Sequence, residues 1–501
     1  MKMYKYITKS ALAMILLATS CTKGFDEINT NPLLLQQSFV KTEDIFTYVA
    51  KRFSFEIHSH QYRISSYSGY YTNPAGGNLF SNNNWANPHN NFYRQYYINA
   101  SELVRMTRDN PAKNDQNAIA RILKAMIFQH LTDLYGDLPY FQAALGVNTT
   151  ILQPFYDKQE DIYYDLLKEV KEATAALGTV PDQQSLGNND LYFQGNIDKW
   201  KKLGNSLRLR MAMRIRYASP QVAAEHINEA TYEPLILTNS DNMFVKTLND
   251  GVEENQNSLY TKSVTLPGNM RVSFTTTDLL GKLNDPRLPI FAKPAELTGD
   301  YLGLPLQLLD ESGSYSGGNI SLMSDMFLQP VFDIVMLNAA EVSFLRAEAA
   351  NAGVTNENAQ TYFANGIRLS MAQYGVPVSD INDYLASPAG TLTGTEEEKL
   401  EQIINQKWIG NYYNHYESYA EFRRTGYPRI WTGESLGVTN GEIPRRLTYP
   451  DEEYQRNEAN VIEASNRMQG GNLLTSRIWW DKKAGLPFHH PRQGMLPTEG
   501  I

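Results

Sequence analysis

Two glutamates, Glu341 and Glu348, have the side chains and the regular spacing that first suggest acid–base catalysis. They lie in the segment EVSFLRAEAA (341–350). On a helix that rises about 1.5 Å per residue, they are about 10.5 Å apart along the axis. Glycoside hydrolases hold their two catalytic carboxyl groups about 5–5.5 or 6.5–9.5 Å apart in an open cleft. Because this spacing is wider and the segment is apolar, we interpret both glutamates as partners in structural ion pairs.

Other catalytic and metal-binding signatures are absent from the sequence. It contains no GxxxxGKS/T, GxGxxG or HExxH motif and no EF-hand loop. The segment nearest to a nucleophile elbow, GSYSG at 313–317, has Tyr315 where the serine would stand. His58 and His60 diverge by about 200° on a helix, so they could not bind one metal ion together. We therefore predict no catalytic residue, no metal site and no cofactor.

The segment Met336–Ala352, which carries the two glutamates, is predicted to be the central helix of an all-helical core. Its apolar residues point in nearly every direction, as in a helix that is buried on all sides. Each of its charges then needs a partner. Periodic apolar residues predict further helices over about 42–60, 114–135, 161–177, 199–216, 357–374 and 396–423. The short link at 353–356 predicts an antiparallel hairpin between the helices on either side of it.

Two regions lack apolar residues that recur at helical spacing over a long stretch. Residues 65–91 are rich in Asn, Gly and Pro and predict a long loop, whose aromatic residues argue against disorder. Residues 231–330 predict loops with short strands and minor helices. The hairpins are compatible with degenerate tetratricopeptide-like repeats, although no clean period is present. Four arginines at positions 208, 210, 214 and 216 predict a solvated or ion-paired helix face.

The N-terminus has the parts of a secretory signal, followed by the only cysteine of the chain, Cys21. A basic region, a short apolar run and small residues precede this cysteine: Lys2, Lys5 and Lys9; ALAMILLA (11–18); Thr19 and Ser20. The apolar run is too short to span a bilayer, which takes about 20 residues. The pattern resembles a bacterial lipoprotein signal with Cys21 as the lipidated residue. Ordinary secretion, with a cysteine there by chance, is the alternative.

The net charge of −9 argues against nucleic acid as a partner, because no basic stripe is available to neutralise phosphates. A chain with one cysteine also has no internal disulfide and no thiolate metal site.

Six segments together resemble the SusD/RagB family, the outer-membrane nutrient-binding lipoproteins of the Bacteroidetes. They are FDEINTNP (25–32), LTDLYGDLPY (131–140), DKWKKLGNSLRLRMAMRI (198–215), EVSFLRAEAANAG (341–353), YAEFRRTGYP (419–428) and IPRRLTYP (443–450). Each segment is weakly specific alone, but their order across nearly the whole mature chain is strongly specific. The YGDLP and NSLR motifs suggest the SusD-like branch that is labelled starch-binding and outer-membrane-associated.

The resemblance implies an all-α fold of tetratricopeptide-like helix hairpins, a SusD-like α-α superhelix with an irregular insert of loops and short strands. The expected divisions are a lipoprotein signal peptide (1–20), a tether (21–37) and one module (38–501), helical at 38–230 and 331–428 and irregular at 231–330 and 429–501. The resemblance implies a protein that is not an enzyme. It would be lipid-anchored to the outer membrane and face the cell exterior, with a SusC-like TonB-dependent transporter as its partner.

Aromatic and amide side chains in two regions are the expected ligand-binding residues. For a glycan, aromatic rings would stack on sugar C–H faces, while amides and charged groups would bind the hydroxyls. The candidates are Tyr70, Tyr71, Asn73 and Trp85 from the first loop, Tyr301 and Tyr315 from the insert, and Trp431. The alternative is a structural role, in which Trp85 packs against the following helix and the tyrosines pack inside the loops.

The leading prediction is therefore capture of a glycan and its delivery to the transporter. Capture of a peptide by a RagB-like lipoprotein remains open as an alternative. A lipid-anchored glycoside hydrolase and a periplasm-facing scaffold of helical repeats are further alternatives.

Overall fold

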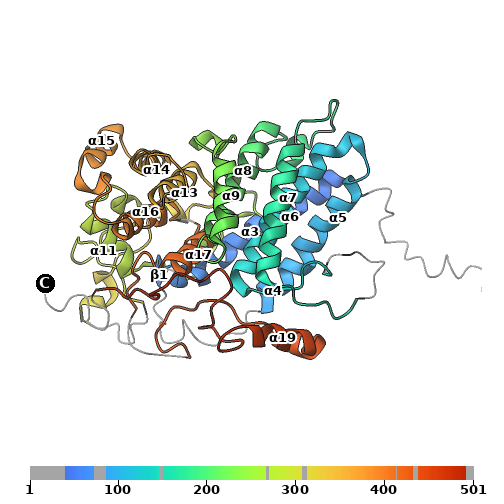
Figure 1. Ribbon diagram of the computed structural model, residues 1–501. Helices are drawn as coiled ribbons and strands as arrows, with labels where there is room; N and C mark the ends of the chain where they lie inside the picture. Colours follow the sequence, from blue (N-terminus) through green and yellow to red (C-terminus); the bar gives the residue numbers. More distant parts are fainter. Residues whose placement is uncertain are drawn as a thin grey trace, which may run out of the picture.

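Long antiparallel helices form the main body of the structure (Figure 1). The computed structural model describes residues 40–72, 86–143, 145, 151–266, 270–306, 313–412, 414–432 and 438–491. The first helices are α3 (Thr42–Tyr67), α4 (Ala86–Asn91), a π-helix (Phe92–Tyr97), α5 (Ile98–Thr107), α6 (Asn114–Tyr135), α7 (Gln159–Ala176), α8 (Ile197–Arg214) and α9 (Pro220–Thr231). From α5 to α9, each helix packs against the next one in the chain. The predicted all-α class is confirmed.

A second set of helices follows the insert. These are α13 (Ala339–Asn351), α14 (Ala359–Gln373), α15 (Val378–Ala386), α16 (Glu396–Gly410) and α17 (His415–Thr425). Helices α13 and α14 form the predicted antiparallel hairpin, and α13 also packs against α8 and α16. Gly366 permits a close contact in the hairpin, because a Cβ added there would lie 2.6 Å from Cε1 of Phe344. The buried residues on all sides of α13 confirm its predicted place at the centre of the core.

The insert contains short helices and takes part in two antiparallel strand pairs. Its helices are α10 (Ser258–Thr265), α11 (Phe274–Lys282) and α12 (Leu288–Phe291). Strand β2 (Met243–Lys246) pairs with β4 (Asp333–Leu337), and β1 (Tyr71–Thr72) pairs with β3 (Arg271–Val272). Strand β2 lies near the start of the insert, and β4 follows its predicted end at residue 330. Their pairing therefore holds the two ends of the insert together, next to α13.

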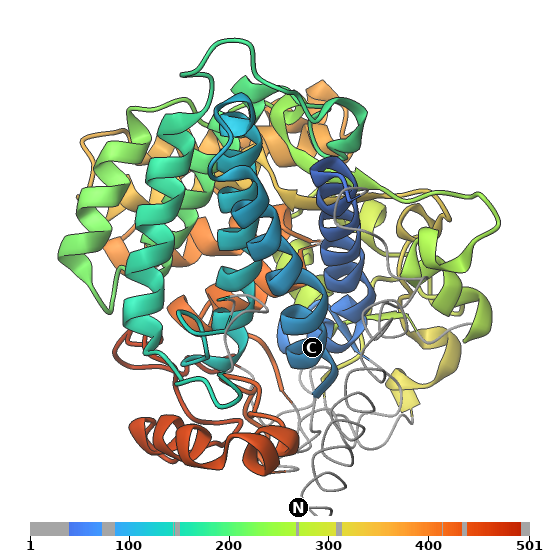
Figure 2. The same ribbon diagram turned by 90° about the vertical axis from the view of Figure 1, so that its right-hand side faces the viewer.

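The chain after α17 wraps along one side of the long helices. It contains α18 (Asp451–Arg456) and α19 (Glu458–Arg467), and Figure 2 shows α19 below the ends of the long helices. Short 3-10 turns occur at Pro111–Lys113, Gly187–Asn189, Asn239–Asp241, Glu253–Asn255, Gly313–Tyr315, Gly317–Asn319, Asp325–Leu328 and Pro388–Gly390.

The helices predicted at 336–352 and 396–423 have wrong boundaries. The segment Met336–Ala352 is not helical at its start, because residues up to Leu337 complete the strand β4. The helix begins after Asn338, whose Oδ1 accepts a hydrogen bond from the Glu341 N–H at 2.7 Å. The helix predicted at 396–423 is two helices, α16 and α17, and the Asn414 side chain caps the second of them.

The loop predicted at 65–91 is shorter than expected at both ends. Helix α3 continues to Tyr67 and α4 begins at Ala86, while β1 lies between them. Ser65 and Ser66 are buried in the last turn of α3 despite their polar side chains. Tertiary packing therefore extends this helix beyond the end that local composition predicts.

Buried ion pairs connect α13 to helices of both sets. Arg210 of α8 binds Glu341 of α13, with Nε and Oε1 2.6 Å apart. Arg424 of α17 binds Glu348 of α13, with Nη2 and Oε2 2.7 Å apart. Both glutamates thus have the structural role predicted for them. Arg214 of α8 joins the same network, so at these positions the predicted arginine face is ion-paired and buried.

Candidate functional site

Segments that are far apart in the chain meet beside the strands β1 and β3. Arg271 forms a β-bridge with Leu322, Ser273 with Leu304, and Leu306 with Thr432. We call these paired residues, together with β1 and β3, the junction. Residues 73–85 follow β1 directly in the chain, and residues 307–312 follow Leu306. The first loop, the insert and the segment after α17 therefore all have part of their backbone at the junction.

Tyr70 and Tyr71, two of the predicted ligand-binding residues, lie in the interior, Tyr71 within the junction and Tyr70 directly before it. The Tyr70 ring stacks on Trp408, with centroids 4.1 Å apart, and its hydroxyl donates a hydrogen bond to the Trp408 carbonyl. Burial raises the pKa of Tyr70 well above its ordinary value. The Tyr71 ring packs edge-on against Tyr412 and His415, each at 5.5 Å. These contacts are those of core residues, and a ligand contact by either ring stays a prediction.

The remaining candidates differ in their exposure. Trp431 is buried, with its ring 6.3 Å from that of Phe274, and its backbone N–H donates to Thr275 Oγ1. Tyr315 is buried in a small cluster with Leu304 and Ile320. Among the described candidates, Tyr301 alone keeps a partly exposed side chain. Asn73, Trp85 and the proposed lipidation site Cys21 lie outside the described residues.

A cavity of about 250 Å³ lies next to the junction, between the segment after α17 and the C-terminal part of the chain. Thr432, Asn440, Glu442, Phe488 and His489 are among its lining residues. The Asn440, Glu442 and His489 side chains are exposed, and Phe488 is partly exposed. An aromatic edge beside an amide and a carboxylate is chemistry that suits a sugar. Sequence reasoning missed these residues, because no local pattern shows that the tail returns to residue 432.

Metal-ligating groups and membrane-spanning helices are both absent from the described residues. These residues contain no group of three or more His, Cys, Asp or Glu side chains that could hold a metal ion. Within the same residues, no helix is both long and apolar enough to cross a membrane. The two glutamates considered for acid–base catalysis are bound by Arg210 and Arg424 in the interior.

Comparison with known proteins identifies both the sequence family and the fold. The SusD-like family, described as "Starch-binding associating with outer membrane", matches residues 34–450. None of the curated proteins compared with the chain matches it.

Solved structures share the fold over most of the chain. A chitin-binding protein has 28% sequence identity and a TM-score of 0.80, covering 88% of this chain and 100% of its own. A SusD homolog from Bacteroides uniformis has 26% identity and a TM-score of 0.75, covering 88% and 99%. A chitin-binding SusD homolog from Flavobacterium johnsoniae has 24% identity and a TM-score of 0.75, with the same coverage, and supports the fold alone.

Proposed function

The chain belongs to the SusD-like family, and from this membership we propose that it captures a glycan at the cell surface and passes it to a SusC-like TonB-dependent transporter. The observation that carries the proposal is the family match over residues 34–450, whose description combines starch binding with the outer membrane. Structural similarity to a chitin-binding protein over 88% of the chain supports a saccharide as the ligand. The ion-paired state of Glu341 and Glu348 supports binding without hydrolysis.

We place the glycan-binding site at the junction and the cavity beside it. Phe488 offers a partly exposed ring to the cavity, where Asn440 and Glu442 offer hydrogen-bonding groups. Tyr301, also partly exposed, packs against the apolar cluster that contains Tyr71 and Val272 of the junction. At about 250 Å³, the described cavity is smaller than the roughly 300–1,000 Å³ of most ligand pockets, so it suits one end of a glycan. The segment with Asn73 and Trp85 follows strand β1 of the junction directly in the chain, so we retain both residues in the proposal.

The double substitution Trp85→Ala and Tyr301→Ala is expected to weaken glycan binding by about tenfold or more, since both stacking surfaces are lost. Affinity electrophoresis in gels that contain starch, chitin derivatives or other polysaccharides measures the effect on the purified protein. Tyr48→Ala removes an exposed tyrosine of α3 and is the matched control, expected to bind as the unsubstituted protein does.

Different outcomes separate the competing functions. Release of shorter sugars during the incubation would contradict binding without hydrolysis. Retention of peptides instead of polysaccharides would favour the peptide-capturing alternative. Normal polysaccharide binding by the double variant would remove the site assignment.

Substitution of Cys21 by serine is expected to move the protein from the outer-membrane fraction to the released fraction, because the acyl chains attach through the cysteine sulfur. A lipid anchor provides about 0.8 kcal/mol of membrane affinity per buried CH₂ group. Fractionation of cells that express each form measures the change, and proteolysis of intact cells tests outward display. A serine variant that stays in the membrane fraction would show that lipidation at Cys21 is not the anchor.

A further inference from the structure

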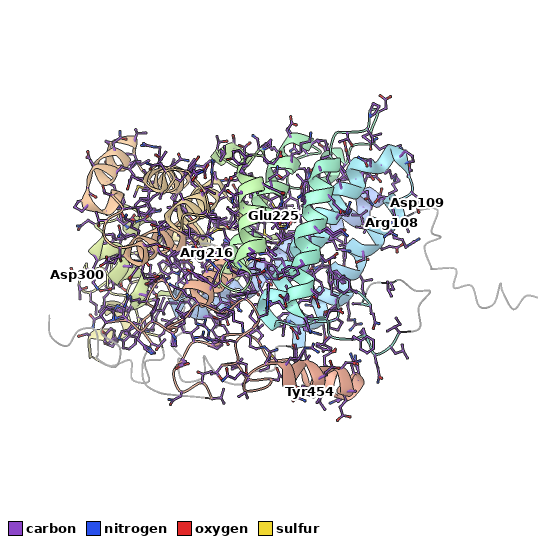
Figure 3. The ribbon with its side chains drawn as sticks, viewed as in Figure 1. Arg108, Asp109, Arg216, Glu225, Asp300 and Tyr454 are labelled. Atoms are coloured by element: carbon purple, nitrogen blue, oxygen red, sulfur yellow. The ribbon has the colours of Figure 1, made fainter. Side chains whose placement is uncertain are left out.

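A groove of about 690 Å³ lies between α7, α8 and α9, on helices that contribute no residue to the junction. In Figure 1, α7 and α9 lie above and to the right of β1. Figure 3 shows the outer face of α9, where Glu225 is labelled. The volume falls within the roughly 300–1,000 Å³ that small-molecule sites occupy. The groove is thus large enough for a ligand and separate from the glycan site proposed above.

An exposed tyrosine, Tyr232, stands at the end of this groove. Its side chain is 89% exposed, the highest value among the described aromatic residues. Its backbone is fixed at the C-terminus of α9, because its N–H donates to the Glu229 carbonyl at 3.3 Å. A ring that is open to solvent can cover an apolar face of a ligand, and tyrosine has only two side-chain torsions to immobilise on binding.

Charged side chains on the floor of the groove are held in place by one another. Arg208 is buried, binds Glu229, and donates from Nε to His226 Nδ1 at 2.8 Å. Lys171 Nζ lies 2.7 Å from Glu229 Oε2. Hydrogen bonds from Lys171 and Arg208 lower the pKa of Glu229 to about 2, so its carboxylate stays ionised. The groove therefore has a fixed pattern of charges before any ligand arrives.

Two further polar groups in the groove have no partner within the described residues. Lys201 forms no hydrogen bond or ion pair through its ammonium group there, and the buried Oγ1 of Thr174 has no hydrogen-bond partner. Gly178 leaves room for this lysine, because a Cβ added to the glycine would lie 3.2 Å from Lys201 Nζ. The Lys201 ammonium is therefore available to a ligand. The Thr174 hydroxyl is enclosed between α7 and α8, since a Cβ added to Gly204 would lie 2.0 Å from it.

The charges that line the groove sum to a positive value. Three cations (Lys171, Lys201 and Arg208) face two carboxylates (Glu229 and Glu233), which leaves +1 on a protein whose net charge is −9. An exposed aromatic ring next to this excess of positive charge matches a sugar that has an apolar C–H face and an anionic substituent.

We propose that the groove between α7, α8 and α9 is a second saccharide-binding site, and that its ligand is a sugar unit with a carboxylate group, such as a uronic acid. Tyr232 stacks on the sugar ring, and Lys201 binds the carboxylate. The site shares only its broad ligand class with the proposed function, and it uses different residues.

Isothermal titration of the full chain with oligomers of galacturonic acid and of mannuronic acid tests this proposal. Tyr232→Ala and Lys201→Gln are each expected to weaken binding by about tenfold. Tyr232→Phe keeps the ring and is expected to bind within about threefold of the unsubstituted protein, which separates stacking from loss of the hydroxyl. Tyr232 is too exposed for its truncation to unfold the protein, and thermal denaturation verifies this.

The results distinguish this site from the glycan site at the junction. The Trp85→Ala, Tyr301→Ala variant is expected to keep its affinity for the uronic acid oligomers, and Tyr232→Ala is expected to keep its affinity for neutral polysaccharides. Absence of binding to both acidic oligomers, or unchanged binding by Tyr232→Ala, would overturn the proposal. Equal, Tyr232-dependent binding of neutral oligosaccharides would overturn the assignment of an anionic ligand.

Discussion

Replacing Arg214 with methionine is expected to lower the free energy of unfolding by about 3–5 kcal/mol. Arg214 is fully buried and binds Glu417 and Glu421, and its Nε lies 3.4 Å from Asp133 Oδ2. Methionine fills much of the same space, but it leaves these carboxylates in the interior with one cation fewer. Denaturation by urea, followed by far-ultraviolet circular dichroism, measures the loss.

The matched control for this experiment is Arg105→Met. Arg105 pairs with Glu102 within α5, where its side chain is 52% exposed. An exposed pair contributes less than about 1 kcal/mol, so this variant is expected to remain close to the unsubstituted protein. Equal effects of the two substitutions would show that burial of the network does not determine its contribution.

Lowering the pH from 7 to 5 is expected to destabilise the protein by about 4 kcal/mol through two buried histidines. Burial lowers the pKa of His58 to about 4 and that of His415 to about 3, from an ordinary value of 6.5. At a pH between the folded pKa of each histidine and 6.5, the unfolded chain binds more protons than the folded chain. Stability is therefore complete above pH 6.5 and falls as the pH drops toward each folded pKa. At pH 5, each histidine accounts for a loss of about 2 kcal/mol.

Substitution of the two histidines, one at a time, isolates this effect. His58→Gln and His415→Asn are each expected to remove about half of the stability difference between pH 7 and pH 5, whatever they do to stability at pH 7. Urea denaturation of the unsubstituted protein and both variants at the two pH values gives the three differences required. A pH dependence that is unchanged in both variants would contradict the assignment to these side chains.

His415 also links this pH dependence to the proposed site. Its ring is 4.9 Å from that of Tyr70 and 5.5 Å from that of Tyr71, which precede and begin β1. Protonation of His415 would place a charge under the junction. We therefore expect the loss of stability to include this part of the molecule.

Helices whose apolar residues recur at regular helical spacing could be predicted from the sequence. The helix predicted from Asn114 to Tyr135 coincides with α6, because apolar spacing, the polar start and Gly136 at its end are all local signals. Family membership was likewise predictable from ordered motifs, and the match over residues 34–450 confirms it. The strand β4 was not predictable in this way, because its partner β2 lies far away in the sequence.

One missed boundary did have a local signal. Asn414 precedes a glutamate three residues later, Glu417, whose N–H donates to the Asn414 side chain. This is the usual sequence mark of a helix start. It lay inside a long segment that otherwise predicts one continuous helix.

The candidate site was only partly predictable, since residue type does not distinguish a buried aromatic ring from an exposed one. The ring of Tyr70 is covered by Trp408, which is distant in the chain, and no pattern within the first loop reveals this contact. Asn440 and Phe488 line the cavity because two parts of the C-terminal chain fold back beside residue 432. Their proximity is a property of the tertiary structure alone.

The pairing of β2 with β4 has a consequence for how ligand preference can change in this chain. The paired strands hold the two ends of the insert together. The ion pair between α8 and α13 lies outside the insert. The short helices and the loops between the two strands therefore start and end on a rigid support. Doubling the length of such a loop adds only about 0.6 kcal/mol of closure entropy. Insertions and exchanged loops should thus be tolerated, so that one helical scaffold can evolve toward many ligands.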